Sequence, residues 1–80
     1  MSEPDSAERE PEGRYANYCE IGNNPLEFLL QFGQWYGGRA KPNIHTRIVT
    51  SPTYAKEILA LLQRSVDAFE CMYGPIKDRS

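Results

Sequence analysis

The sequence predicts an α+β fold in which a three-stranded antiparallel β-meander is followed by one long C-terminal amphipathic helix (β-β-β-α). Apolar residues recur every three or four positions between Ser51 and Gly74, which is the period of one helix face. Three upstream segments rich in aromatic and β-branched residues are separated by Gly, Pro and Asn clusters, a pattern typical of short strands. The short connections favour hairpins, and therefore an antiparallel sheet.

The first strand is expected over residues 14–21, where Tyr15, Tyr18 and Ile21 favour a pleated surface. Residues 22–25 read Gly-Asn-Asn-Pro, which is a dense turn signal. We therefore expect a hairpin with a loop of about four residues at this point.

The second strand is expected over residues 26–36, with a basic, glycine-containing loop over residues 37–43. The loop is longer than a tight hairpin needs. Alternation places Leu29 on one strand face. The other face holds the apolar residues Leu26, Phe28, Leu30 and Phe32.

The third strand is expected over residues 44–50, which are rich in β-branched residues. Strict alternation along this strand defines two faces. One face carries Ile44, Thr46, Ile48 and Thr50, and the other carries His45, Arg47 and Val49.

The helix is bounded by residues that start and stop helices. Ser51 is expected to cap its N-terminus through the side-chain hydroxyl, and Pro52 fits the first helical position. Gly74 can adopt the positive φ that ends a helix, and Pro75 blocks its continuation. The predicted apolar face comprises Ala55, Ile58, Leu59, Leu62, Val66, Phe69 and Tyr73.

Composition indicates one small domain over residues 14–74, preceded by a disordered acidic tail over residues 1–13 and followed by a short tail over residues 75–80. No apolar run approaches the roughly 20 residues that cross a bilayer, and the acidic N-terminus is unlike a secretory signal. We therefore expect a cytoplasmic protein. Two cysteines are too few for a disulfide framework, so we expect Cys19 and Cys71 to be reduced and buried or half-buried.

The amount of apolar surface predicts association. We expect the helix to pack on the sheet face that carries Phe28, Leu30, Phe32 and Ile48. A folded unit of about 60 residues is marginal alone, and a three-stranded sheet leaves a second face and two open edges. The sequence therefore predicts a homodimer or a larger oligomer.

Catalytic and metal-binding patterns are weak. Cys19, His45 and Cys71 are isolated from one another, whereas zinc sites use four ligands that usually come in close pairs. Cys71 lies near a predicted helix C-terminus, where the dipole disfavours a thiolate. Spatial pairing of Cys19 with His45 remains open. We expect no cofactor, no metal and no enzymatic activity.

Aromatic and cationic residues do gather around the second predicted hairpin, a mixture that single-stranded nucleic-acid-binding proteins use. The folded part is barely basic, which weighs against this hypothesis. The residues concerned are Trp35, Tyr36, Arg39, Lys41, His45 and Arg47.

Four segments carry a family resemblance. They are Tyr-Ala-Asn at residues 15–17, Asn-Pro-Leu-Glu-Phe-Leu-Leu-Gln-Phe-Gly at 24–33, His-Thr-Arg-Ile-Val-Thr-Ser-Pro-Thr-Tyr-Ala-Lys at 45–56, and Phe-Glu-Cys-Met-Tyr-Gly at 69–74. In order and spacing they resemble the bacterial family catalogued as domain of unknown function 3467. Gln31 departs from the pattern, which has an acidic residue there. The resemblance implies a small cytoplasmic protein of a bacterium or phage, and it implies no activity.

The leading interpretation is a non-enzymatic homo-oligomeric protein-interaction or regulatory module of a bacterium or phage, which binds another protein. We expect Leu29, Trp35 and Tyr36 to make the contacts, since aromatic residues dominate interface hot spots. Single-stranded nucleic-acid binding through the hairpin is the alternative.

Overall fold

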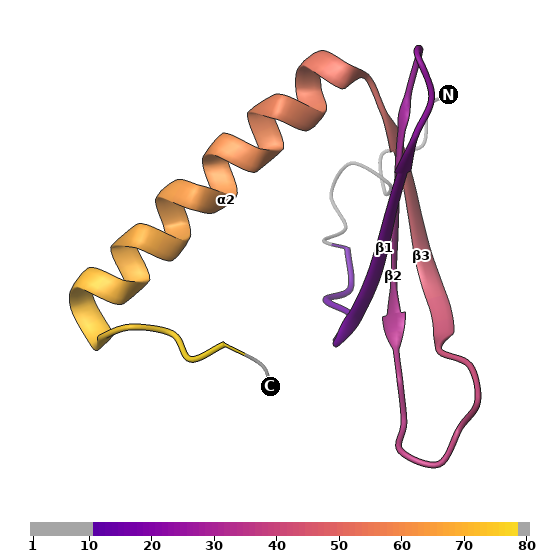
Figure 1. The fold of residues 1–80 in the computed structure, drawn as a ribbon, viewed down its shortest axis with the longest axis horizontal. Helices are drawn as coiled ribbons and strands as arrows, with labels where there is room; N and C mark the ends of the chain where they lie inside the picture. The colour runs from indigo at the N-terminus through magenta and orange to yellow at the C-terminus, as the bar shows by residue number, and fades with distance from the viewer. Residues whose placement is uncertain (1–10, 79–80) are drawn as a thin grey trace, which may run out of the picture.

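The computed structural model describes residues 11–78 and has the predicted β-β-β-α order (Figure 1). Strands β1 (Tyr18–Asn23), β2 (Phe28–Gln34) and β3 (Asn43–Thr50) form an antiparallel sheet in chain order. Helix α2 (Pro52–Tyr73) follows β3. The predicted fold class is therefore confirmed. Most of the predicted acidic tail, residues 1–13, lies outside the described residues.

The first hairpin is shifted along the chain relative to expectation. β1 begins at Tyr18 rather than at residue 14 and includes residues 22 and 23, which had been assigned to the turn. Asn24 makes the turn instead, because its Oδ1 accepts from the N–H groups of Leu26 at 2.8 Å and Glu27 at 2.9 Å. The side chain of Asn24 thus ends β1 by an Asx turn.

The β2–β3 ladder contains a bulge. Phe32 lies opposite Thr46, but the next residue, Gly33, lies opposite Ile44. His45 is therefore the extra residue of β3, and side chains beyond it no longer follow strict alternation. Gly33 is the one buried residue among residues 11–78.

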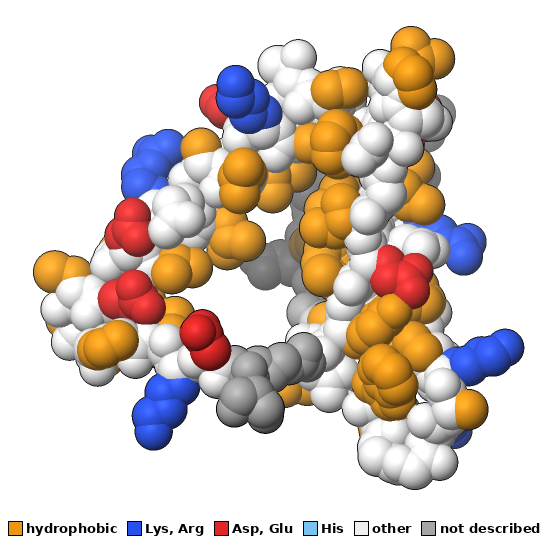
Figure 2. Space-filling view, in the orientation of Figure 1, with side chains coloured by type: hydrophobic (Ala, Val, Ile, Leu, Met, Phe, Trp, Pro, Cys, Tyr) orange, Lys and Arg blue, Asp and Glu red, His pale blue; other side chains and the backbone are white. Residues whose placement is uncertain are grey.

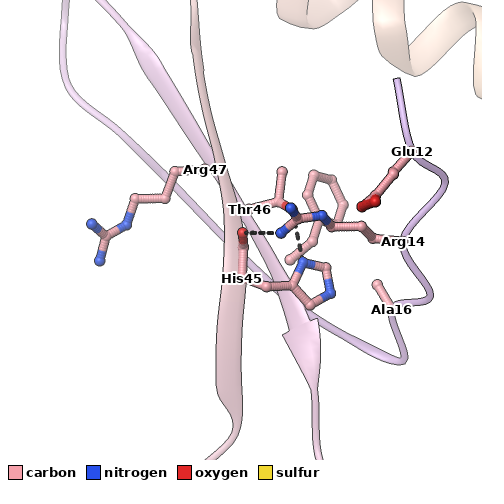
Figure 3. Close-up of a pocket in the computed structure, with 7 residues that line it drawn as sticks. Glu12, Arg14, Ala16, His45, Thr46 and Arg47 are labelled. Carbon is pink, nitrogen blue, oxygen red and sulfur yellow. Dashed lines mark hydrogen bonds between the residues drawn. The ribbon is translucent and has the colours of Figure 1, made fainter. Parts of the chain in front are cut away.

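The sheet has two chemically different faces. We call the side that looks toward α2 the inner face, and the opposite side the outer face. The strand register puts Cys19, Ile21, Phe28, Leu30, Phe32, Thr46 and Ile48 on one face, and Tyr18, Glu20, Leu29, Gln31, Arg47 and Val49 on the other. The first set is the inner face, because Thr46 lies on the α2 side of β3 and Arg47 on the opposite side (Figure 3).

Both ends of α2 form as the sequence predicts. Ser51 is extended (φ −76°, ψ 157°), and its hydroxyl accepts from the Tyr54 N–H at 3.1 Å, with Pro52 in the first turn. Gly74 has φ 102° and ψ 169°, a region open to glycine alone. The N–H of Gly74 donates to the Glu70 carbonyl at 2.9 Å, which closes the last turn.

The expected packing of the helix on its own sheet is wrong. Only Ser51 separates β3 from α2, and from this junction the helix diverges from the sheet (Figure 1). Figure 2 shows hydrophobic side chains along both sides of the resulting opening. Among residues 11–78, no hydrophobic side chain is buried. The prediction that Cys19 and Cys71 are buried or half-buried is also wrong, since both are exposed and the chain offers no interior to receive them.

The dimensions of the chain reflect this opening. Its radius of gyration is 16.2 Å, whereas a compact domain of 80 residues has about 11.6 Å. Residues 11–78 therefore leave uncovered apolar side chains that a compact domain would bury.

Substitution of Gly33 tests whether the close approach of the β3 backbone requires a glycine at this position. A Cβ on Gly33 would lie 2.2 Å from the Asn43 carbonyl oxygen and 2.8 Å from the Ile44 Cα. Because these are backbone atoms, no side-chain rotation relieves the clash. We expect Gly33→Ala to lower the free energy of unfolding by about 3 kcal/mol, measured by urea denaturation at fixed protein concentration. Gly22→Ala is the matched control, because nothing lies within 4 Å of its added Cβ. Equal stability of the two variants would contradict the bulge geometry.

Candidate functional site

The segment before β1 is attached to the sheet by Asn17. Its backbone N–H donates to the Gly33 carbonyl at 3.0 Å. Its side chain then pairs with the backbone of Trp35, accepting at Oδ1 from the N–H at 2.8 Å and donating from Nδ2 to the carbonyl at 3.4 Å. The Asn17 amide thus continues the β1–β2 ladder by imitating a backbone peptide.

His45 makes a second attachment at the bulge. Its Nε2 lies 2.9 Å from the Tyr15 carbonyl, so Nε2 carries the hydrogen and donates. In the neutral ring Nδ1 then accepts from the Thr46 hydroxyl at 2.7 Å. Arg14 adds a hydrogen bond from Nη1 to the His45 carbonyl at 3.2 Å. Both ring nitrogens are therefore engaged within the chain.

Arg14, His45 and Thr46 border an open hollow of about 560 Å³. In Figure 3, His45 and Arg14 lie on one side of β3, and Arg47 points to the other side. The prediction that His45 and Arg47 share a strand face is therefore wrong, and the bulge is the reason. The lining residues are Glu12, Arg14, Ala16, Phe32, His45, Thr46 and Arg47.

His45 is the imidazole of the hollow. Both of its nitrogens are directed at groups of its own chain, the Tyr15 carbonyl and the Thr46 hydroxyl. No group of three His, Cys, Asp or Glu side chains within the described part of the chain is placed to hold a metal ion. What the arrangement does is hold the N-terminal segment against β3.

The outer face carries a hydrogen-bonded row across all three strands. Arg47 on β3 donates from Nε to Gln31 Oε1 at 2.6 Å, and Gln31 on β2 donates from Nε2 to Glu20 Oε1 at 3.3 Å. On β1 the Tyr18 hydroxyl donates to the other Glu20 oxygen. This hydrogen bond, assisted by desolvation and the Glu20 charge, raises the pKa of the Tyr18 phenol.

Gln31 is the centre of this row, which we call the polar row. It needs one acceptor toward Arg47 and one donor toward Glu20, and an amide side chain provides both. An acidic residue, which the family pattern has here, would accept from Arg47 but could not donate to Glu20. The polar row was not predicted from the sequence, because it follows from the strand register, which sets Glu20 opposite Gln31 and Gln31 opposite Arg47.

Apolar groups lie at both ends of the polar row. Leu29 faces Val49 and the glycine at position 22, so its side chain has room beside it. At the other end Trp35 packs edge-on against Tyr18, with ring centroids 5.5 Å apart and planes at 79°. Along β2 the two ends are about 20 Å apart. Leu29 and Trp35 therefore share the outer face, as two separate patches.

The loop after β2 is internally organised. The Trp35 indole donates to the Arg39 carbonyl at 3.1 Å, and the Arg39 N–H donates to the Tyr36 carbonyl at 3.1 Å. The Arg39 guanidinium lies 5.6 Å from the centroid of the Tyr36 ring, and Gly38 has the φ of +85° that the turn needs. Tyr36 also donates to the Gln34 side chain at 2.7 Å.

The six residues proposed for nucleic-acid binding do not form one surface. Trp35, Tyr36, Arg39 and Lys41 belong to or border the loop, whereas the bulge sends His45 to the inner face and Arg47 joins the polar row on the outer face. A strand of nucleic acid needs cations that follow one path. This placement does not favour the nucleic-acid hypothesis, which stays a prediction.

Comparison with known proteins now identifies the family. A family model described as "Protein of unknown function (DUF3467)" matches residues 3–78, nearly the whole chain. The chain belongs to the DUF3467 family. No curated protein and no solved structure matches it. In this DUF3467 chain the family-like segments supply backbone devices: the Asn17 pairing, the close approach at Gly33 and the Ser51 cap. In addition, no helix within residues 11–78 has the length and apolar character to cross a membrane.

The role of His45 as an attachment can be measured by proteolysis. His45→Ala removes the hydrogen bond to the Tyr15 carbonyl, which is worth about 1 kcal/mol net, so detachment of the segment should become about fivefold more frequent. Tryptic cleavage after Arg14 should accelerate accordingly, because slow proteolysis tracks the opened population.

Val49→Ala, on the same strand but exposed on the outer face, is the matched control and should leave the cleavage rate unchanged. An unchanged rate in His45→Ala would show that His45 does not hold the segment.

Proposed function

We propose that this DUF3467 chain is a non-enzymatic, homo-oligomeric module that binds another protein. The observation that carries the proposal is that no hydrophobic side chain among residues 11–78 is buried. Hydrophobic burial is the dominant favourable term in folding, and net stability is only a small difference from the entropy cost. Association with further chains is therefore needed to supply the burial that one chain lacks.

The exposed apolar side chains lie on both the sheet and the helix. Ile21 is 59% exposed and Ile48 45% on the sheet, and Leu59 is 65% exposed on α2. Obligate homodimer interfaces are more hydrophobic than transient ones, so a self-contact through these side chains fits an obligate assembly.

The outer face is the surface we assign to the protein partner. Its two patches, Leu29 with Val49 and Trp35 with Tyr18, lie at either end of the polar row. Val49 is 60% exposed and Trp35 47% exposed. Aromatic anchors combined with hydrogen-bonding groups are typical of protein interfaces. Tyr36 at the loop would extend the second patch. We place this activity in the cytoplasm of a bacterium or phage-infected cell.

A non-enzymatic role is supported by the hollow beside β3. The space is open to solvent, whereas catalytic sites usually close around the substrate and exclude water.

Self-association is tested by size and by concentration dependence. Light scattering at micromolar concentration should give a mass at least twice the chain mass of 9.1 kDa. The thermal unfolding midpoint should rise with protein concentration, as mass action requires for a folded oligomer. A species of 9.1 kDa with a cooperative, concentration-independent transition would refute the proposal.

Partner binding is tested by affinity capture from the source cell with a Leu29→Ser/Trp35→Ala variant. The wild type should retain a specific protein that the variant loses. Tyr15→Ala is the control, because Tyr15 is an exposed aromatic residue outside the outer face and its removal should leave the capture intact. Light scattering of both variants shows whether the oligomer persists.

Capture of nuclease-sensitive material in place of a protein would contradict this reading of the outer face and favour the nucleic-acid alternative.

A further inference from the structure

We infer that the opening between α2 and the inner face is occupied by α2 of a second copy, so that two chains form an exchanged-helix dimer. The inference rests on the proposed homo-oligomerisation and adds which surfaces make it. Two apolar surfaces border the opening without packing on each other (Figure 2). On the sheet side Ile21 is 59% exposed and Ile48 45%, and on the helix side Leu62 is 59% exposed.

Helix α2 is too long to be covered completely by the sheet of its own chain. Its 22 residues extend about 33 Å, whereas the eight residues of β3, the longest strand, extend about 26 Å. A helix folded back from Ser51 would project beyond the sheet. The projecting end carries Met72 and Tyr73, the most exposed large hydrophobic residues of α2.

The width of the apolar surface on α2 leads to the same conclusion. At 100° per residue, large apolar side chains span an arc of about 160° from Leu61 through Leu62 to Leu59. A helix that rests on one partner needs a stripe of only about 100°. The helix therefore has apolar surface for two neighbours, and a sheet together with a second helix would satisfy it.

A second copy is the occupant that fits these surfaces without repulsion. In a two-fold dimer residue i of one copy contacts residue j of the other, and j contacts i, so here the apolar arc of α2 would meet the apolar inner face twice. The charged residues of α2 all lie outside the apolar arc. Apart from His45 at the bulge, the strand residues of the inner face carry no acidic or basic side chain. The short Ser51 junction directs α2 away from its own sheet, which leaves it available to another. The charged helix residues are Lys56, Glu57, Arg64, Asp67 and Glu70.

The native cysteines make the exchange measurable. Cys19 lies on the inner face, and Cys71 lies about 180° around α2 from Leu62. One chain keeps Cys19 and carries Cys71→Ser. A second, tagged chain carries Cys19→Ser, Cys71→Ser and Val66→Cys, which places its thiol in the apolar arc. The two chains are unfolded together, refolded and treated with a short bis-maleimide.

Exchange predicts a cross-linked heterodimer between Cys19 of one chain and position 66 of the other. The control replaces the second chain by tagged Cys19→Ser, whose thiol at Cys71 points away. Both thiols are held in the same assembly at high effective concentration, but only position 66 lies in the apolar arc that faces the sheet, so its yield should be at least about tenfold higher. Ile58→Cys provides a second position in the arc if Val66→Cys does not fold by circular dichroism.

Failure of the exchange is distinguishable from failure of the oligomer. A chain with Cys19, Val66→Cys and Cys71→Ser, refolded with excess cysteine-free chain, reports closure onto its own sheet as a persistent cross-link within one chain. That result, or the absence of cross-linking in a sample that light scattering shows to be oligomeric, overturns the exchange and leaves the oligomer standing. A monomer by light scattering overturns both.

Discussion

The apolar inner face of the sheet and the apolar arc of α2 are the constraint on which the rest of the structure depends. Within one chain, what holds the shape is hydrogen bonding: the two ladders, the Asn24 turn, the Ser51 cap and the Gly74 closure. Such bonds contribute little net free energy because water competes for the same groups. They specify where the hydrophobic side chains point but do not bury them. Stability must therefore come from whatever covers these two surfaces.

The bulge at His45 places His45 and Arg47 on opposite faces of the sheet. Without it, His45 and Arg47 would project from the same side and could act on one ligand. With the bulge, His45 is hydrogen-bonded to the N-terminal segment, and Arg47 is hydrogen-bonded to Gln31 in the polar row. The bulge itself depends on Gly33, where the β3 backbone approaches closer than any Cβ permits. One glycine thus separates the attachment on the inner face from the polar row on the outer face.

Sequence reasoning succeeded where the determinant is local and failed where it is a register or a packing choice. The limits of α2 follow from Ser51, Pro52 and Gly74 alone, and all three act as expected. The bulge could not be predicted, because alternation in residues 44–50 is read without knowing which residue opposes Gly33. The packing of α2 could not be predicted either, because an apolar stripe says that a helix is covered but not by which chain. Asn17 was missed because its role depends on Trp35 lying beside it.

Exchange of α2 would have a consequence for how the outer face works. The self-contact uses the inner face and the helix, so both outer faces of a dimer remain accessible to the protein partner. Two equivalent sites in one assembly raise the apparent affinity for a partner with repeated or paired motifs, because the second contact forms at high effective concentration. Weak individual patches, such as Leu29 with Val49 and Trp35 with Tyr18, then suffice. A small chain without a core of its own would in this way obtain both its stability and its binding strength from pairing.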